Sequence, residues 1–357
     1  MTEPRVVVVG TSAGGLSALK RLVAQFPPDF PAAVFVVQHL AAEVSIDVWL
    51  DALGRAGSLP CIRASDGERF KEGHVYLAPT DHHLLVGKNE KIMVTKGARE
   101  NRWRPAIDPL FRSAAVACGN RVVSVLLTGH LDDGTAGTIA VKRCGGTTVV
   151  QDPEEADHPD MPMNAIQNAE VDHVVPLAEM GALLTRLVDG EMGDGFAPPE
   201  DIVTEARIAE RVLSDLESVG ELGGQVPFNC PDCGGVLWQI HAEDMRYRCH
   251  TGHSFTAPVL LAAQTARIEE TMWVALRMFE ERRNLLMTMA NKKDGRGTVP
   301  SAAERAKDSM VHIKRIRAML MSEDKATEDA WGHQGEKQSP AGGAKGKKKV
   351  EAEAKKG

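Results

Sequence analysis

The chain has 357 residues, of which 43% are hydrophobic and 25% are charged, and these values are ordinary for a globular protein. The length allows a full-size domain together with a smaller one. A formal net charge of −7 disfavours a nucleic-acid partner. The sequence has neither an apolar run of membrane-spanning length nor a signal-peptide pattern, so we expect no membrane insertion and a cytoplasmic location. Nothing in the sequence indicates an oligomeric state.

Strand and helix signals alternate through the first half of the chain. Apolar runs such as residues 5–10 and 121–129 predict buried strands, and amphipathic stretches such as 16–25 predict the helices between them. Several strands are apolar on both faces, which is typical of a parallel sheet covered by helices on both sides. We therefore expect a doubly wound, mostly parallel α/β domain over residues 1–190. Short strands near residues 74–95 are expected to form an antiparallel edge.

The second half of the chain is predicted to contain smaller units. A stretch rich in glycine, proline and acidic residues predicts a linker, and one amphipathic helix follows it with a stripe of Ile208, Val212, Leu216 and Val219. A low-complexity end predicts a disordered tail. We expect a linker and helix at residues 191–226 and a zinc-ribbon-like Cys/His module at 227–256. A helical hairpin at 257–322 and the tail at 323–357 are expected to follow.

The first predicted strand ends in the sequence Gly10-Thr11-Ser12-Ala13-Gly14-Gly15. A dinucleotide-binding turn would need a glycine where Ser12 stands, and a P-loop would need a Gly-Lys-Ser/Thr ending, which is absent. The same residues match G-x-S-x-G, in which a sharp strand-turn-helix corner exposes a nucleophilic serine. A plain glycine-rich turn with an idle serine is the other interpretation.

A nucleophilic serine needs a base and a group that orients the base. His39 follows the second buried strand, and both Asp132 and Asp133 follow another, so these side chains should meet Ser12 at one edge of a parallel sheet. His130 is a second candidate base. Each residue taken singly is also explained by a local role such as helix capping, so the coincidence at three strand ends favours catalysis. The order Ser, His, Asp disfavours an α/β-hydrolase fold.

Five segments in order make the first domain resemble the catalytic domain of chemotaxis protein-glutamate methylesterases, the CheB family. They lie within residues 5–188 and read VVVVGTSAGGLSAL, VVQHL, RPAIDPLFRSAA, LLTGHLDDGTAG and VVQDPEEADHPDMPMNAI. The resemblance implies that Ser12 is the nucleophile, His39 the base and Asp133, rather than Asp132, the orienting aspartate. It implies hydrolysis of glutamyl γ-methyl esters on a methylated chemoreceptor or receptor-like protein, release of methanol, and no cofactor for catalysis. Some family members also deamidate glutamine.

The chain departs from the family pattern in the turn that carries the aspartate. The family's G-M-G-x-D-G reads Gly129-His130-Leu131-Asp132-Asp133-Gly134 here, so the oxyanion pocket is expected to differ in shape. This difference favours an alternative function, a non-catalytic signalling adaptor that docks on receptors. The resemblance begins at the esterase itself, so we expect regulation without a receiver domain. Arg102 and Arg104 are expected either to attract acidic receptor segments or to pair with local acids.

Three cysteines and a histidine in the second half have the spacing of a zinc ribbon. Cys230 and Cys233 form a C-x2-C pair, and Cys249 and His253 form a C-x3-H pair fifteen residues later. His250 is an alternative fourth ligand and His241 a weaker one. Four such ligands close a tetrahedral site, so we expect a structural zinc that takes no part in catalysis. The other interpretation is that these residues only pack.

Overall fold

The computed structural model of the chain describes residues 4–190, 197–211, 216–240, 245–291 and 300–321. Contacts within the chain divide it into two units, residues 1–266 and 267–357. The predicted disordered tail at residues 323–357 and the candidate ligand His241 lie outside the described residues. Within the described parts of the chain, no helix combines the length and the apolar character that crossing a membrane requires.

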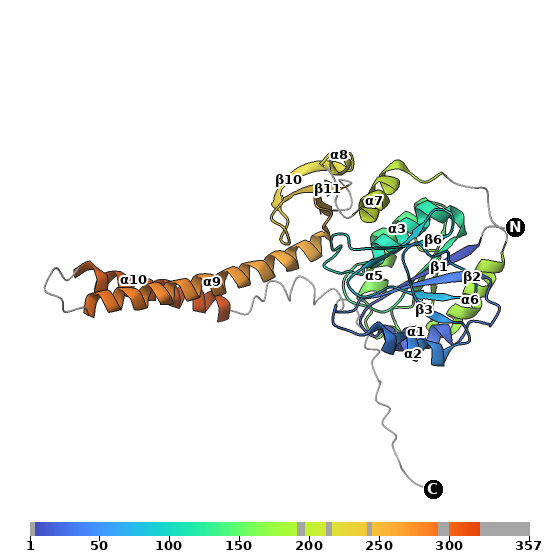
Figure 1. Cartoon of the computed structure of the whole chain (residues 1–357), viewed down its shortest axis with the longest axis horizontal. Coiled ribbons are helices and arrows are strands. Elements are labelled where there is room, and N and C mark those ends of the chain that lie inside the picture. Colours follow the sequence, from blue (N-terminus) through green and yellow to red (C-terminus); the bar gives the residue numbers. More distant parts are fainter. Residues whose placement is uncertain (1–3, 191–196, 212–215, 241–244, 292–299, 322–357) are drawn as a thin grey trace, which may run out of the picture. The chain divides into compact units, whose positions relative to one another are not determined.

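A seven-stranded sheet with the order β3-β4-β2-β1-β7-β8-β9 forms the centre of the first unit (Figure 1). Each neighbouring pair of its strands is parallel. The order changes direction beside β1, and a crevice at the carboxyl ends of the strands is expected at such a point. The strands are β1 (Arg5–Thr11), β2 (Ala32–Gln38), β3 (Cys61–Arg63), β4 (Val75–Leu77), β7 (Val122–Leu126), β8 (Thr147–Gln151) and β9 (His173–Val175).

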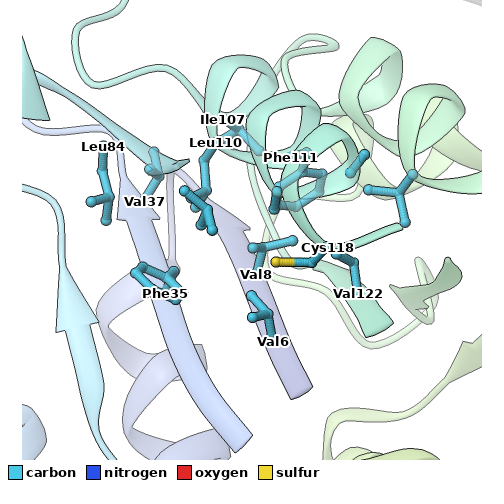
Figure 2. Packing of buried hydrophobic residues seen from close by; sticks show 14 of the residues in the cluster. Val6, Val8, Phe35, Val37, Leu84, Ile107, Leu110, Phe111, Cys118 and Val122 are labelled. Atoms are coloured by element: carbon cyan, nitrogen blue, oxygen red, sulfur yellow. The ribbon is translucent and has the colours of Figure 1, made fainter. Parts of the chain in front are cut away.

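Helices cover both faces of this sheet, as the apolar runs predicted. Alternate residues of β1 enter two separate cores, because successive side chains of a strand point to opposite faces. Val6 and Val8 pack in the cluster with Phe35 and Phe111 that Figure 2 shows, and Val7 lies in the other cluster. The first core lies under α3 (Ile107–Cys118), α4 (Thr135–Arg143) and α5 (Asp160–Asn168), and the second under α1 (Gly15–Val23), α2 (Ile46–Ala56) and α6 (Leu177–Asp189).

The strands near residues 74–95 differ from the predicted antiparallel edge. β4 joins the main sheet as a parallel strand, whereas β5 (His83–Gly87) and β6 (Lys91–Thr95) form a separate antiparallel hairpin. The hairpin is attached to α3, since the backbone N–H of Val86 donates to Ser113 Oγ at 3.0 Å. A short 3₁₀ helix, η1 (Gly119–Arg121), connects α3 to β7.

The single amphipathic helix predicted across residues 208–219 is wrong. Helix α7 (Glu200–Glu210) stops before Arg211, because the backbone of Arg211 is extended, with φ −88° and ψ 141°. A second short helix, α8 (Leu216–Gly220), carries Val219, and Val212 lies outside the described residues. Ile208 and Val219 still share one apolar cluster, so two short helices bury the residues that the sequence placed on one stripe.

The Cys/His module is a four-stranded antiparallel sheet within the first unit. It consists, in spatial order, of β10 (Gly223–Asn229), β11 (Val236–Ile240), β12 (Arg246–Cys249) and β13 (Ser254–Thr256). The helices α9 (Ala257–Asn291) and α10 (Pro300–Met321) follow it. In the second unit they contact each other as an antiparallel pair, with the Phe279 and His312 rings stacked 4.9 Å apart and Arg317 bonded to Glu280.

Candidate active site

Ser12 lies directly after β1, on a turn whose glycines are required by close contacts. Gly14 has φ +76°, a left-handed conformation that favours glycine. A Cβ on Gly15 would lie 1.9 Å from Gln38 Oε1 and 2.7 Å from Thr11 Oγ1, so a larger residue would displace these side chains. The Ser12 backbone is fixed by donation from its N–H to Thr128 O at 3.0 Å. The turn therefore holds the Ser12 side chain at the carboxyl edge of the sheet.

His39 follows β2 and connects the serine to the aspartate. Its Nδ1 lies 3.2 Å from Ser12 Oγ, and its Nε2 lies 2.7 Å from Asp133 Oδ2. The indole ring of Trp103 stacks on the imidazole, with 4.5 Å between ring centres and 9° between planes. In the familiar serine-protease arrangement Nε2 faces the serine, so this imidazole is turned around. A neutral His39 therefore carries its proton on Nε2, and Nδ1 is the atom that can accept the Ser12 proton.

Asp133 is buried, with 2% of its surface exposed, and lies in a cage of donors. Its Oδ2 accepts from the Ile107 backbone N–H at 2.7 Å, and its Oδ1 accepts from Asn101 Nδ2 at 3.0 Å. Burial by itself would raise the pKa of Asp133, but the hydrogen bonds from His39, Ile107 and Asn101 hold that pKa well below its usual range. The carboxylate therefore stays charged beside the imidazole.

Asp132, the neighbouring candidate, is directed elsewhere. Its carboxylate lies beside the Thr256 side chain, in strand β13 of the Cys/His module, and its buried Oδ1 has no hydrogen-bond partner among the residues that the structure describes. Burial is the main cause that raises the pKa of Asp132 to about 6. The structure thus brings Asp133, and not Asp132, to His39.

Three side chains around Ser12, His39 and Asp133 were not singled out from the sequence: the buried Asn101 and Asp108, and the partly buried Trp103. The Asn101 amide donates to Asp133 and also to Asp108 Oδ2 at 3.0 Å. The other oxygen of Asp108 accepts from the backbone N–H groups of Gly134 and Gly137 at 3.0 and 2.7 Å. Burial, followed by the adjacent Asp133 charge, raises the pKa of Asp108. An acidic residue at the start of an otherwise apolar helix was the signal that could have identified Asp108.

The turn at residues 129–134 keeps its glycine-like backbone although its sequence has changed. Leu131, at the family's glycine position, has φ +65° and an exposed side chain. Asn164 Nδ2 donates to its carbonyl at 2.8 Å, which stabilises this conformation. His130 is bonded to the surface residue Asp160, with Nδ1 3.0 Å from Oδ2, and is not the histidine that contacts Ser12. A Cβ on Gly129 would lie 2.8 Å from Ser12 Cβ, so this turn contacts the serine directly.

The two arginines of the segment before α3 have different environments. Arg104 pairs with Asp81 at 2.6 Å and donates to the Gly97 carbonyl at 2.7 Å. For Arg104, pairing with a local acid is therefore the interpretation that the structure supports. Arg102 is exposed on the same turn as Trp103. Arg102 is therefore the solvent-exposed cation of this pair.

The Cys/His module brings its four predicted ligands together. The donor atoms of Cys230, Cys233, Cys249 and His253 all lie within 4.8 Å of one another. Cys249 Sγ is 3.8 Å from Cys233 Sγ and 3.4 Å from His253 Nδ1. A tetrahedral zinc with ordinary bond lengths requires about 3.8 Å between two sulfurs and about 3.6 Å between a sulfur and a nitrogen. The residues therefore fit a metal ion of this kind.

The surroundings of the four side chains support the same ligand set. The Cys230 N–H donates to Gly235 O at 2.7 Å, which closes a tight knuckle around the first cysteine pair. His253 Nε2 lies 3.9 Å from Asp232 Oδ2, and a carboxylate behind a ligating histidine is a usual arrangement at metal sites. The alternative ligand, His250, is outside this group, and its ring lies close to Gly235, where a Cβ would approach it to 2.8 Å.

A serine that is hydrogen bonded to a buried Asp–His pair, at the carboxyl edge of a doubly wound parallel sheet, defines an esterase of the serine-hydrolase kind. The chain belongs to the CheB methylesterase family, whose family model matches residues 7–184. This finding confirms the resemblance that the five sequence segments indicated.

Named relatives support the same family. The chain is 36% identical over 181 residues to a putative protein-glutamate methylesterase/protein-glutamine glutaminase of Leptospira interrogans, covering 51% of this chain and 93% of that protein. A protein-glutamate methylesterase/protein-glutamine glutaminase of Bordetella pertussis is 41% identical, over 53% of this chain. The match spans 55% of the Bordetella protein, about half of its length. The crystal structure of the Thermotoga maritima CheB methylesterase catalytic domain, at 34% identity and a TM-score of 0.50, matches 52% of this chain and all of that domain.

Proposed function

We propose that this protein is a protein-glutamate methylesterase that hydrolyses glutamyl γ-methyl esters on a methylated chemoreceptor or receptor-like protein. The hydrogen-bonded series Ser12–His39–Asp133 is the observation that carries the proposal. The names of the relatives support the substrate class and a second activity, the deamidation of glutamine. The proposal includes a cytoplasmic location, because none of the six cysteines forms a disulfide, as is usual in a reducing compartment.

The proposed reaction follows the usual two steps of a serine esterase. Ser12 Oγ attacks the ester carbonyl while His39 Nδ1 takes its proton, and Asp133 stabilises the imidazolium that forms. The tetrahedral intermediate collapses, and methanol leaves with the proton from His39. Water then attacks the acyl-enzyme by the same route and releases the glutamate carboxylate. The Ser12 N–H is already bonded to Thr128 O, so we assign the oxyanion to backbone amides at the start of α1, near Ala13.

Two observations favour this enzyme over the non-catalytic adaptor. A buried carboxylate that stays charged is costly, and the four donors around Asp133 keep it charged beside His39, where it can stabilise an imidazolium. The turn that departs from the family sequence retains the left-handed backbone at Leu131. The sequence change that favoured the adaptor therefore leaves the turn in a glycine-like conformation.

Methanol release tests the proposal directly. We expect the full chain to release methanol from the methylated cytoplasmic fragment of a chemoreceptor, and none from the same fragment without methylation. A fragment with glutamine at the acceptor positions should release ammonia if the second activity is also present. A folded chain that binds the methylated fragment without releasing methanol would instead support the adaptor.

We also propose that Cys230, Cys233, Cys249 and His253 hold a structural zinc ion. When bound, zinc would join β12 to the cysteine knuckle and so stabilise a module with a small apolar core. We expect elemental analysis of the purified chain to give one zinc per chain, and Cys249→Ser to lose it. Cys61→Ser is the matched control, because burial raises the pKa of the Cys61 thiol to about 11 and keeps it protonated. Equal zinc content in the two variants would contradict this ligand set.

A further inference from the structure

A tight turn at Glu100–Trp103 contacts two members of the triad. Asn101 and Arg102 have φ values of +49° and +69°, and Glu100 and Trp103 pair across the turn by backbone hydrogen bonds of 2.9 and 3.2 Å. Positive φ at both central residues is the signature of a type I′ turn, which asparagine favours at the first of them. The Asn101 side chain contacts Asp133, and the Trp103 ring covers His39.

The same turn is bonded to the Cys/His module on its other side. The Asn101 N–H donates to Ser254 O at 2.8 Å, and the Ser254 N–H donates to Arg99 O at 3.3 Å. The turn thus continues the sheet of the module beyond β13 as a short parallel bridge. Ser254 directly follows the candidate ligand His253, and the Thr256 side chain of the same strand lies beside Asp132. One edge of the module therefore contacts both the turn that carries Asn101 and the segment that carries Asp132 and Asp133.

Buried charges bind the module to the α/β domain at this place. Glu100 accepts from Arg112 of α3 at 2.8 Å and pairs with Arg248 of β12 at 3.0 Å. Glu205 of α7 pairs with Arg246 of β12 at 2.7 Å. All five residues are less than a tenth exposed, and opposite charges in such surroundings hold their geometry closely. The pairing of Glu100 fixes the residue next to Asn101.

We propose that Asn101 is a positioning residue for Asp133 and that the metal-bound module holds Asn101 in place, so that the module completes the active site. The inference rests on the proposed esterase function. Asn101 does not react; its amide holds Asp133 Oδ1 while His39 occupies Oδ2. The module supplies Ser254 O for the Asn101 backbone and Arg248 for Glu100. Loss of the metal therefore frees the turn and lets Asp133 move away from the imidazole.

The first test compares two variants at position 101. Asn101→Gly keeps the left-handed backbone and the backbone N–H but removes the side-chain amide. Asn101→Asp keeps the side-chain shape but loses the N–H donor to Asp133. We expect kcat for methanol release to fall about 10- to 100-fold in both, with KM unchanged, because Asn101 contacts the aspartate and not the substrate. Asn168→Ala, which removes an exposed amide on α5, should match the wild type. An unchanged kcat, or a change in KM alone, would overturn the assignment.

The second test removes the metal from the full chain with a chelator and uses readouts that need no receptor. The first is the downfield NMR signal of the proton between His39 and Asp133, and the second is the rate at which a sulfonyl fluoride labels Ser12. In the wild type we expect the signal to be lost and the labelling rate to fall about tenfold, with recovery when zinc is added. In Asn101→Gly, metal removal should have no additional effect, because both changes act through one residue.

These outcomes separate the inference from the proposed function. Equal labelling rates with and without metal would overturn the inference. So would a double change, metal removal from Asn101→Gly, that lowers the labelling rate by the product of the two single effects, as independent changes do. A wild type that releases no methanol but is labelled at Ser12 in a metal-dependent manner would contradict the proposed substrate alone. Methanol release together with metal-independent labelling would contradict only the role of the module.

Discussion

Replacing Ser12 by alanine should reduce methanol release by about four to six orders of magnitude and leave the fold intact. Removing the serine of a hydrogen-bonded triad has effects of this size in serine hydrolases. The fold should tolerate the change because the structural bonds of Ser12 are made by its backbone. Its N–H donates to Thr128 O, and its carbonyl accepts from Gln38 Nε2 at 2.8 Å. Release of methanol by a coupled alcohol assay and far-ultraviolet circular dichroism would measure the two expectations.

Ser17→Ala is the matched control, since Ser17 is exposed on α1, five residues further along the chain. It should retain wild-type activity. Residual activity above a hundredth of the wild-type rate in Ser12→Ala would mean that another group attacks the ester. That result would remove Ser12 as the nucleophile, even if the protein remains an esterase.

Glu205→Ala should lower the free energy of unfolding by about 3–5 kcal/mol, the usual cost of removing one partner of a buried ionic cluster. Glu205 is 2% exposed and pairs with Arg246, Arg248 and Arg112 at 2.7, 3.5 and 3.2 Å. Without its carboxylate Arg112 and Arg248 keep their pairing with Glu100, whereas Arg246 loses the ion pair that it makes at 2.7 Å. Urea unfolding at constant zinc concentration would measure the change.

Glu210→Ala provides the comparison on the same helix, because Glu210 is exposed and its removal should alter the free energy of unfolding by less than about 0.5 kcal/mol. If both variants unfold at the same urea concentration, the ionic cluster contributes no net stability. Hydrogen exchange at the Asn101 and Ser254 amides would show in addition whether Glu205→Ala separates the module from the turn.

The sheet was predictable from the sequence because its central strands are continuous apolar runs between helical stretches. β1 and β2 are buried on both faces, and this produces the pattern without alternation that predicted them. β3 has only three residues, half-exposed or exposed, so it offers no periodic signal. The helix break at Arg211 was missed because Ile208 and Val219 share one cluster with Ile240 of β11. Tertiary packing, and not one helix, accounts for their spacing.

Those residues of the candidate site that directly follow a strand of the main sheet could be predicted from the sequence. Ser12, His39 and Asp133 each come after an apolar run, and the sheet topology brings their side chains together. Asn101 and Trp103 belong to a turn without a preceding strand of the main sheet, so nothing in the pattern marked them. Arg246 and Arg248 alternate along β12 as surface residues of a strand do, and only their burial shows the contact with the α/β domain.

The pairing of the turn with β13 gives the protein a defined order of maturation during its synthesis. Ser12, His39 and Asp133 leave the ribosome well before Ser254. Roughly 120 residues lie between Asp133 and Ser254. At ordinary rates of synthesis this interval is about 6 to 24 s. A nascent chain therefore carries all three triad residues before the strand that supports them exists. On the proposal made above, full esterase activity begins only when β13 has been translated and the module has captured its metal.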